Sequence, residues 1–131
     1  MNTILPAPNG PYFCGGDFVV VTASGGKTAS QATLCRCGGS ANKPYCDSSH
    51  ERLRFADAGR LPANAPPGRA EPGTATLTPL TNGPLRVDGP VTIVATDGRT
   101  STGDPLLLCR CGGSSTKPFC DGTHRRNGFT G

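Results

Sequence analysis

Cysteine and histidine, whose sulfur and nitrogen atoms bind soft and borderline metal ions, recur at one spacing in two parts of this chain. Each copy reads cysteine, one residue, cysteine, eight residues, cysteine, three residues, histidine. The positions are Cys35, Cys37, Cys46 and His50 in the first copy, and Cys109, Cys111, Cys120 and His124 in the second. Six of the seven cysteines and both histidines fall in these copies, so we predict that all eight residues are metal ligands.

The residues around these donors indicate how they are presented. Pro44, and Pro118 in the second copy, suit the first turn of a helix. Cys46 and His50 would then project from one face of that helix, whose positive end would favour an anionic cluster. Gly38-Gly39 follows the first two cysteines, where glycine lets the backbone approach a cluster closely and aim N–H groups at sulfur.

The donor set alone leaves two kinds of metal centre open. Structural zinc sites also use three cysteines and one histidine, and their ligands usually come in pairs two to four residues apart. Here the first pair is separated by a single residue, and such a narrow pair can still hold one ion. A structural zinc module that presents a surface to a partner is therefore the alternative to an iron–sulfur protein.

The chain as a whole consists of two repeats. Asn-Gly-Pro at 9–11 recurs at 82–84, an offset of 73, whereas the cysteine segments recur with an offset of 74. The second copy has therefore gained one residue in a loop. We predict a first repeat at 1–56, a linker rich in Pro, Gly and Ala at 57–78, and a second repeat at 79–131.

Each repeat contains short β-rich runs that lead into its cysteine segment. The runs at 18–22 and 32–34, and those at 91–96 and 106–108, predict one hairpin per repeat, with glycine in each turn. A repeat of about 60 residues is marginal alone. We therefore predict a small α+β fold of mostly short strands with one short helix per metal motif, its two repeats packed as a pseudo-two-fold intramolecular dimer within a monomer.

Composition narrows the function classes. Only 34% of the 131 residues are hydrophobic, whereas Gly 19 and Pro 13 are abundant, as in small domains that a metal stabilises. Aromatic residues make up 5% and the net charge is +4, so we expect no nucleic-acid partner. No targeting segment or long apolar run is visible, which predicts a cytoplasmic protein without membrane contact. Because both histidines are assigned to metal, no nucleophile–base pair remains and we expect no enzyme.

The segments Cys46-Asp47-Ser48-Ser49-His50 and Cys120-Asp121-Gly122-Thr123-His124 resemble the CDGSH signature of the mitoNEET family. The upstream Cys-x-Cys extends this resemblance, and two copies in one chain resemble the tandem branch of the family. The first copy departs from the signature at Ser48, where the family has glycine, but it loses no donor.

The resemblance implies two 2Fe–2S clusters, each held by three cysteines and one histidine. Cys35 and Cys37 would hold the inner iron of the first cluster, and Cys46 and His50 its outer iron. The second cluster would be held in the same way by Cys109 and Cys111, then by Cys120 and His124.

The ligand set predicts the behaviour of such clusters. Exchanging one thiolate for neutral imidazole removes negative charge, so the potential should lie above the roughly −400 mV of plant-type ferredoxins. Histidine must be neutral to bind metal, so acid should release the outer iron, faster near pH 5–6 than near pH 8. We therefore expect electron transfer to redox proteins, cluster transfer to apo-acceptor proteins, or both functions.

For three residues outside the donor set the sequence predicts a structural environment. Cys14 has no cysteine counterpart, because an offset of 73 aligns it with Val87, and we expect it to be a small buried residue. Arg36 and Arg110, which lie between the paired cysteines, are expected to face solvent or to balance cluster charge.

Overall fold

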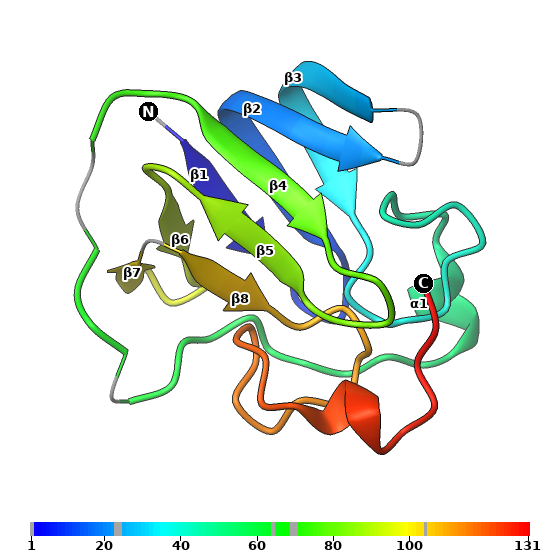
Figure 1. Ribbon diagram of the computed structural model, residues 1–131. Helices are drawn as coiled ribbons and strands as arrows, with labels where there is room; N and C mark the ends of the chain where they lie inside the picture. The colour runs from blue at the N-terminus through cyan, green and yellow to red at the C-terminus, as the bar shows by residue number, and fades with distance from the viewer. Residues whose placement is uncertain (1, 23–24, 64, 69–70, 104) are drawn as a thin grey trace.

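The computed structural model describes residues 2–22, 25–63, 65–68, 71–103 and 105–131 (Figure 1). Within these residues the chain is mostly β, as expected, and helix is confined to the four-residue α1 (Ser49–Arg52) and the 3-10 turn η1 (Thr123–Arg125). No described helix has the length and apolar character needed to cross a membrane. The strands are β1 (Thr3–Pro6), β2 (Tyr12–Thr22), β3 (Gly25–Leu34), β4 (Ala75–Pro79), β5 (Leu85–Asp88), β6 (Thr92–Val94), β7 (Thr100–Thr102) and β8 (Leu106–Leu108).

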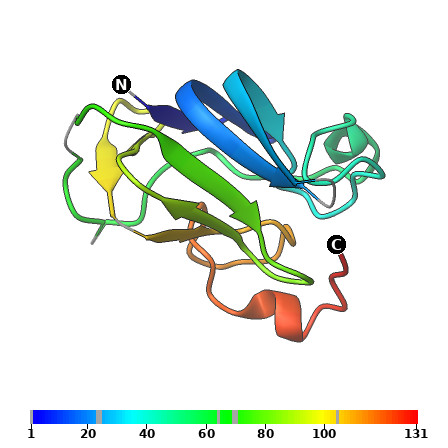
Figure 2. The ribbon, with the colours of Figure 1, turned by 45° about the horizontal axis from the view of Figure 1, so that its top comes forward.

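All eight strands belong to one sheet, in the order β7-β6-β1-β2-β4-β5-β8, with β3 attached to β2. β1 pairs with β2 of its own repeat and, in parallel, with β6 of the other repeat. β4 pairs with β5 of its own repeat and, in parallel, with β2 of the first repeat. Figure 2 shows the sheet bent so that β2 and β3 lie above β4, β5 and β8. Each repeat therefore has one strand, β1 or β4, that pairs on one side with its own repeat and on the other side with the other repeat.

The hairpin expected in the first repeat is present as β2 and β3, with its tip at 23–24 outside the described residues. In the second repeat the expected partners are wrong, because β6 pairs with β7 across Asp97-Gly98 and β8 pairs with β5. The strand that corresponds to β2 is interrupted at Gly89-Pro90, where proline has no N–H to give to a ladder. At the same place β2 continues through a bulge between Gly15 and Phe18.

The apolar core draws on both repeats. Its fully buried members are Ile4, Tyr12, Val20, Ala75, Leu77, Val87, Ile93 and Leu108. Cys14 lies among them with 4% of its surface exposed, so its expected place in the core is confirmed. Two of these fully buried residues, Ala75 and Leu77, fall in the range expected as a linker. The alternation of buried and partly buried residues along β4 was hidden in sequence by the surrounding Ala, Pro and Gly residues.

Candidate metal centres

The first two candidate ligands of each motif follow the last strand of their repeat. The sulfur atoms of Cys35 and Cys37, after β3, lie 3.9 Å apart. Those of Cys109 and Cys111, after β8, lie 3.8 Å apart. Two sulfur ligands of one tetrahedral metal ion, each about 2.3 Å from the metal, are separated by about 3.8 Å. Each pair is therefore spaced to share one metal ion.

The second pair of each motif is also close, but not for the expected reason. The Cys46 sulfur lies 3.6 Å from Nδ1 of His50, and the Cys120 sulfur lies 3.5 Å from Nδ1 of His124. The prediction that a helix begins at Pro44 is wrong, because α1 begins at Ser49.

The segment before Cys46 is a turn with a cis Lys43-Pro44 bond, which ends in a bridge between Leu34 and Tyr45. Hydrogen bonds close this turn, since the Ser40 hydroxyl accepts from the amide of Asn42 and donates to the carbonyl oxygen of Tyr45. The second motif has the same turn, with a cis Lys117-Pro118 bond. The sequence could not distinguish this proline turn from a helix start, because both accept a residue without an N–H.

Backbone N–H groups point at the sulfur atoms, as expected from the glycines. The amide of Gly39 lies 3.4 Å from the Cys37 sulfur, and that of Gly113 lies 3.4 Å from the Cys111 sulfur. A further amide, that of Ser48, donates to the Cys46 sulfur at 3.3 Å. Such contacts favour a thiolate over a thiol.

Burial opposes this effect on the inner cysteines. It is the largest cause that raises the pKa of Cys37, although the amide of Gly39 acts in the other direction. Burial likewise raises the pKa of Cys109. A thiolate in such a place is stable when a cation neutralises it, so the chemistry of the donor set fits a bound metal centre.

The two motifs touch each other. A Cβ atom on Gly38 would lie 2.7 Å from the carbonyl oxygen of Cys111, and one on Gly112 would lie 2.5 Å from the carbonyl oxygen of Cys37. Both glycines have φ above +75°, at +83° and +80°. Glycine is thus required here for its conformation and for the close approach of two backbones.

The iron-binding zinc finger CDGSH type family matches the chain twice, at residues 9–51 and 82–125. Together these two segments cover well over half of the 131 residues. The chain belongs to the CDGSH family. A search of curated proteins found no match. Membership indicates an iron–sulfur protein, and each matched segment contains one complete set of four candidate ligands.

The aspartate of each CDGSH segment accepts hydrogen bonds that connect two parts of its motif. Asp47 accepts hydrogen bonds from the amide of Ser49 at 3.0 Å and from the amide of Ala41 at 2.8 Å. Asp121 does the same with Thr123 and Ser115, and the Thr123 hydroxyl is the largest cause that holds the pKa of this carboxyl well below its usual range. The carboxylates therefore tie the turn to the histidine segment.

Ser48, the departure from the CDGSH signature, keeps the backbone of the glycine it replaces. Its φ and ψ are 70° and 14°, and those of Gly122 in the second motif are 88° and 1°. Both residues are left-handed, so the exchange leaves the local conformation unchanged.

The arginine between the paired cysteines is buried, and the expectation that it faces solvent is wrong. Arg36 is 2% exposed and forms an ion pair of 2.7 Å with Asp57. Its Nε donates to the carbonyl oxygen of Gly10 at 2.8 Å, and Nε of Arg110 donates to that of Gly83 at 2.9 Å. These acceptors belong to the repeated Asn-Gly-Pro turns, so each arginine fastens the start of its repeat to its cysteine loop.

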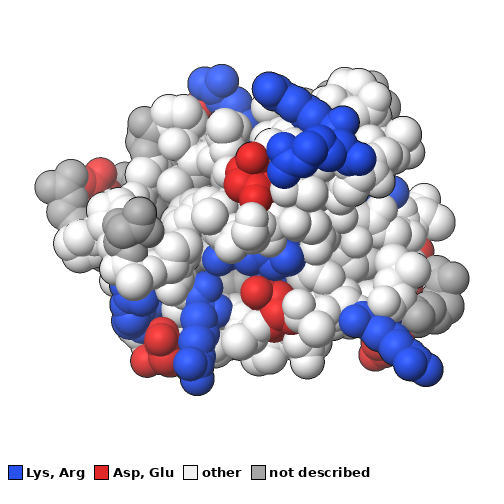
Figure 3. Space-filling model, turned by 90° about the horizontal axis from the view of Figure 1, so that it is seen from below, with Lys and Arg blue, Asp and Glu red and all other residues white. Residues whose placement is uncertain are grey.

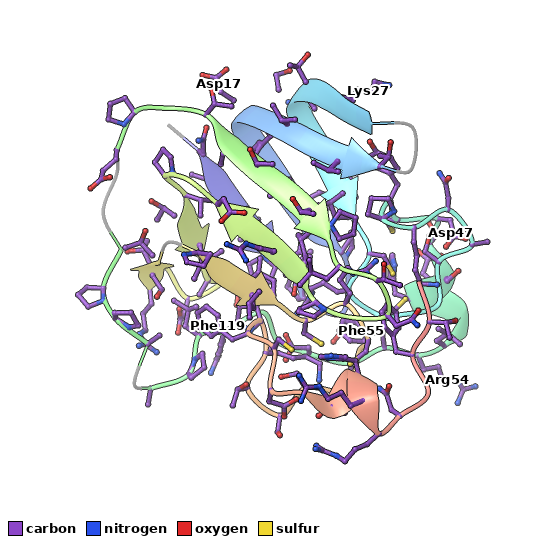
Figure 4. All side chains as sticks on the ribbon, in the orientation of Figure 1. Asp17, Lys27, Asp47, Arg54, Phe55 and Phe119 are labelled. Carbon is purple, nitrogen blue, oxygen red and sulfur yellow. The ribbon has the colours of Figure 1, made fainter. Side chains whose placement is uncertain are left out.

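An aromatic residue after each motif completes the contact between the repeats. Phe55 lies under Arg36 of its own repeat, 4.9 Å from ring centre to guanidinium carbon. It also lies under Lys117 of the other repeat, at 5.9 Å. Figure 4 places Phe55 toward the centre of the molecule, whereas Asp47 and Arg54 lie at its edge near α1. Phe55 and Phe129 stand at matching positions of the two repeats, 74 residues apart, but nothing in the sequence indicates which residues their rings contact.

Proposed function

We propose that the chain binds two 2Fe–2S clusters, each through three cysteines and one histidine, and acts in electron transfer, cluster transfer or both. The observation that carries this proposal is the arrangement of the donors in pairs. Within each motif the first two cysteines form one close pair, and the third cysteine and the histidine form another.

A zinc site would demand a different arrangement. Four donors must converge on one ion, each about 2.0–2.3 Å from it. Among the described residues, no group of three or more His, Cys, Asp or Glu side chains is placed to hold a single metal ion. Two separate pairs suit two adjacent irons, which favours the iron–sulfur proposal over the zinc alternative.

One inner cysteine of each centre is buried, and the other three candidate ligands are partly exposed. Cys35 and Cys109 are buried, whereas the histidines are partly exposed. His124 lines an open hollow together with Leu107 and Arg125. A 2Fe–2S cluster, when bound, can take up one electron and can pass to an acceptor protein. We propose the histidine end as the route for either exchange, since His124 lines this hollow while Cys35 and Cys109 are anchored in the core.

The register of the strands supports a pseudo-two-fold relation between the repeats. The antiparallel pair Thr3 and Gly15 recurs as Thr76 and Asp88, an offset of 73. The parallel pair Thr3 and Thr92 recurs as Thr76 and Val19, with the two repeats exchanged. We propose that the chain is a monomer that contains this internal dimer.

The surface supports protein partners rather than nucleic acid. Figure 3 views the molecule from below, the side of η1 in Figure 1, and shows basic and acidic side chains scattered among neutral ones. The described part of this face carries no continuous basic patch of the kind that follows a phosphate backbone. We propose redox or apo-acceptor proteins as partners, a cytoplasmic location and no enzymatic activity of the chain itself.

Anaerobic isolation with quantification of iron and inorganic sulfide tests the proposal. The expected protein is red-brown and contains about four irons and about four sulfides per chain. Cys120→Ser should reduce both numbers by about half, since it disables one centre, whereas Cys14→Val should leave them unchanged. Colourless protein with zinc and no sulfide would establish the zinc alternative.

Two further measurements separate the two activities. Mixing with an apo-acceptor should change the visible absorbance if the cluster is transferred, and a steady absorbance excludes donation. Reduction by ordinary cellular reductants supports electron transfer, and a cluster that they cannot reduce excludes it.

A further inference from the structure

The hydroxyl of Tyr12 connects the first repeat to the cysteine loop of the second. Tyr12 lies in β2 with no exposed surface. Its oxygen lies 2.6 Å from the carbonyl oxygen of Cys109 and 3.1 Å from that of Pro118. The amide of Cys109 donates to the same Pro118 oxygen at 2.8 Å. The hydroxyl has one proton, so it donates chiefly to the nearer oxygen, that of Cys109, while it lies against both ends of the loop that carries Cys111.

The ring of Tyr12 contacts the other centre. The guanidinium carbon of Arg36, which lies between Cys35 and Cys37, is 5.5 Å from the ring centre. Arg36 is fixed in turn by Asp57. One side chain thus touches the residue between two ligands of the first centre and the backbone of a ligand of the second.

The second repeat has no equivalent of this hydroxyl. The residue that matches Tyr12 is Leu85, since Tyr12 pairs with Leu34 and Leu85 pairs with the matching Leu108. Leucine has no group that can donate a hydrogen bond. The first loop keeps the hydrogen bond from the amide of Cys35 to the carbonyl oxygen of Pro44, at 2.8 Å. A leucine at the matching position adds nothing to that bond.

We propose that Tyr12 is a positioning residue that makes the two centres unequal, so that the second centre retains its cluster longer than the first. The physical reason is that a buried hydrogen bond must break before the loop of Cys109 and Cys111 can move, whereas the loop of Cys35 and Cys37 carries no such bond from Leu85. The inference rests on the proposed iron–sulfur function.

Loss of visible absorbance in the presence of an iron chelator tests the inference. The unaltered protein should lose absorbance in two phases. His50→Cys and His124→Cys each alter the spectrum of one centre and so assign the phases. Tyr12→Phe should accelerate the phase of the second centre by about 3- to 10-fold, as expected for the loss of one buried hydrogen bond, and should change the first by less than about twofold. Equal acceleration of both phases, or none, would overturn the inference.

Tyr45→Phe is the matched control, because it also removes a tyrosine hydroxyl and the second motif has Phe119 at the same position. It should leave the phase of the second centre unchanged. A Tyr12 side chain that merely filled the core would loosen both centres when altered, so selectivity for one centre separates positioning from general stability.

Hydrogen exchange of the unaltered protein, followed by mass spectrometry, tests the same point without a variant. Peptides that cover 109–118 should exchange at least about threefold more slowly than those that cover 35–44. Equal rates, or slower exchange at 35–44, would contradict the role of Tyr12. Protein that contains no sulfide would instead refute the proposed function, and the exchange measurement would still report on the loop.

Discussion

The ammonium nitrogen of Lys43 lies 5.6 Å from the centre of the Phe129 ring, so a cation of the first repeat rests on an aromatic ring of the second. The reciprocal contact joins Lys117 to Phe55. Each phenylalanine also lies beneath the buried arginine of its own repeat. Each ring therefore contacts one arginine of its own motif and one lysine of the other motif, and so links the two motifs.

Phe129→Leu should lower the free energy of unfolding by about 1–2 kcal/mol, because it removes two cation–π contacts from a residue that is 9% exposed. Thermal melting of the metal-loaded protein measures the effect. Phe13→Leu is the control, since Phe13 is 48% exposed and should tolerate the change. Equal losses in the two variants would show that the cations contribute nothing.

Gly112→Ala should disrupt both metal centres. The added Cβ would lie 2.5 Å from the carbonyl oxygen of Cys37, which belongs to the other motif. Because this neighbour is a backbone atom, the clash can be relieved only by moving the two loops apart. With the cost of the left-handed conformation included, we expect a loss of stability above about 2 kcal/mol and reduced iron content.

Gly98→Ala is the control for this clash. Gly98 has φ of +90°, but no atom lies within 4 Å of the Cβ that it would gain. This variant should show the conformational cost alone, about 1–2 kcal/mol, and retain its iron. Equal iron loss from both variants would refute the contact between the motifs.

Ser48→Gly should stabilise the first motif. Ser48 has φ of 70°, a conformation that costs an L-residue about 1 kcal/mol and costs glycine nothing. The melting temperature should therefore rise, and Gly122→Ser, the reverse change in the second motif, should lower it by a similar amount. A lower melting temperature in Ser48→Gly would show that the serine side chain stabilises the fold by more than its left-handed backbone conformation costs.

The donor spacing, the predominance of short strands, the first hairpin and the burial of Cys14 were all predictable, because each depends on residues close in sequence or on the internal repeat. The additional pairing of β1 and β4 with strands of the other repeat was not predictable. When two copies are alike, a strand fits its own repeat and the other repeat equally well on pattern alone. Gly89-Pro90 was the one sequence feature that indicated an interruption of the second hairpin.

The burial of Arg36 was missed for a related reason. Its acceptors include the carbonyl oxygens of Gly10 and Ala7, and a carbonyl oxygen is present whatever the residue type. Its charged partner, Asp57, lies in a range that was expected to be a linker. A pairing that depends on backbone atoms and a distant side chain leaves no local pattern.

Asp57→Asn tests the importance of that pairing. The Arg36 side chain is 1% exposed, so loss of its partner leaves a buried charge uncompensated, at a cost of about 3 kcal/mol. Asp88→Asn is a matched control, because the ion pair of Asp88 with Arg86 is exposed on both sides and should be worth less than about 1 kcal/mol. Thermal melts of the two variants should differ clearly. Similar melting temperatures would mean that the backbone acceptors hold Arg36 without the carboxylate.

Cys14→Val should remove part of the alkaline instability of the fold. Burial raises the pKa of Cys14 to about 12 from an ordinary value near 9. Since the folded state holds this proton more tightly than the unfolded state, the stability that it contributes is complete below pH 9 and is lost as the pH rises from 9 to 12. Valine, which stands at the matching position 87, has no proton to lose and is similar in size.

Melting temperatures of the two proteins should therefore be similar at pH 8, within the change that about 1 kcal/mol produces. Above pH 9 the unaltered protein should lose stability faster than Cys14→Val, and the difference should grow up to pH 11. Groups that do not interact with Cys14 cancel in this comparison, whereas the pKa of Tyr12, which burial and in part the charge of Cys14 raise, should be lower in Cys14→Val. Parallel curves across this range would mean that the Cys14 thiol is not held in its protonated form by the core.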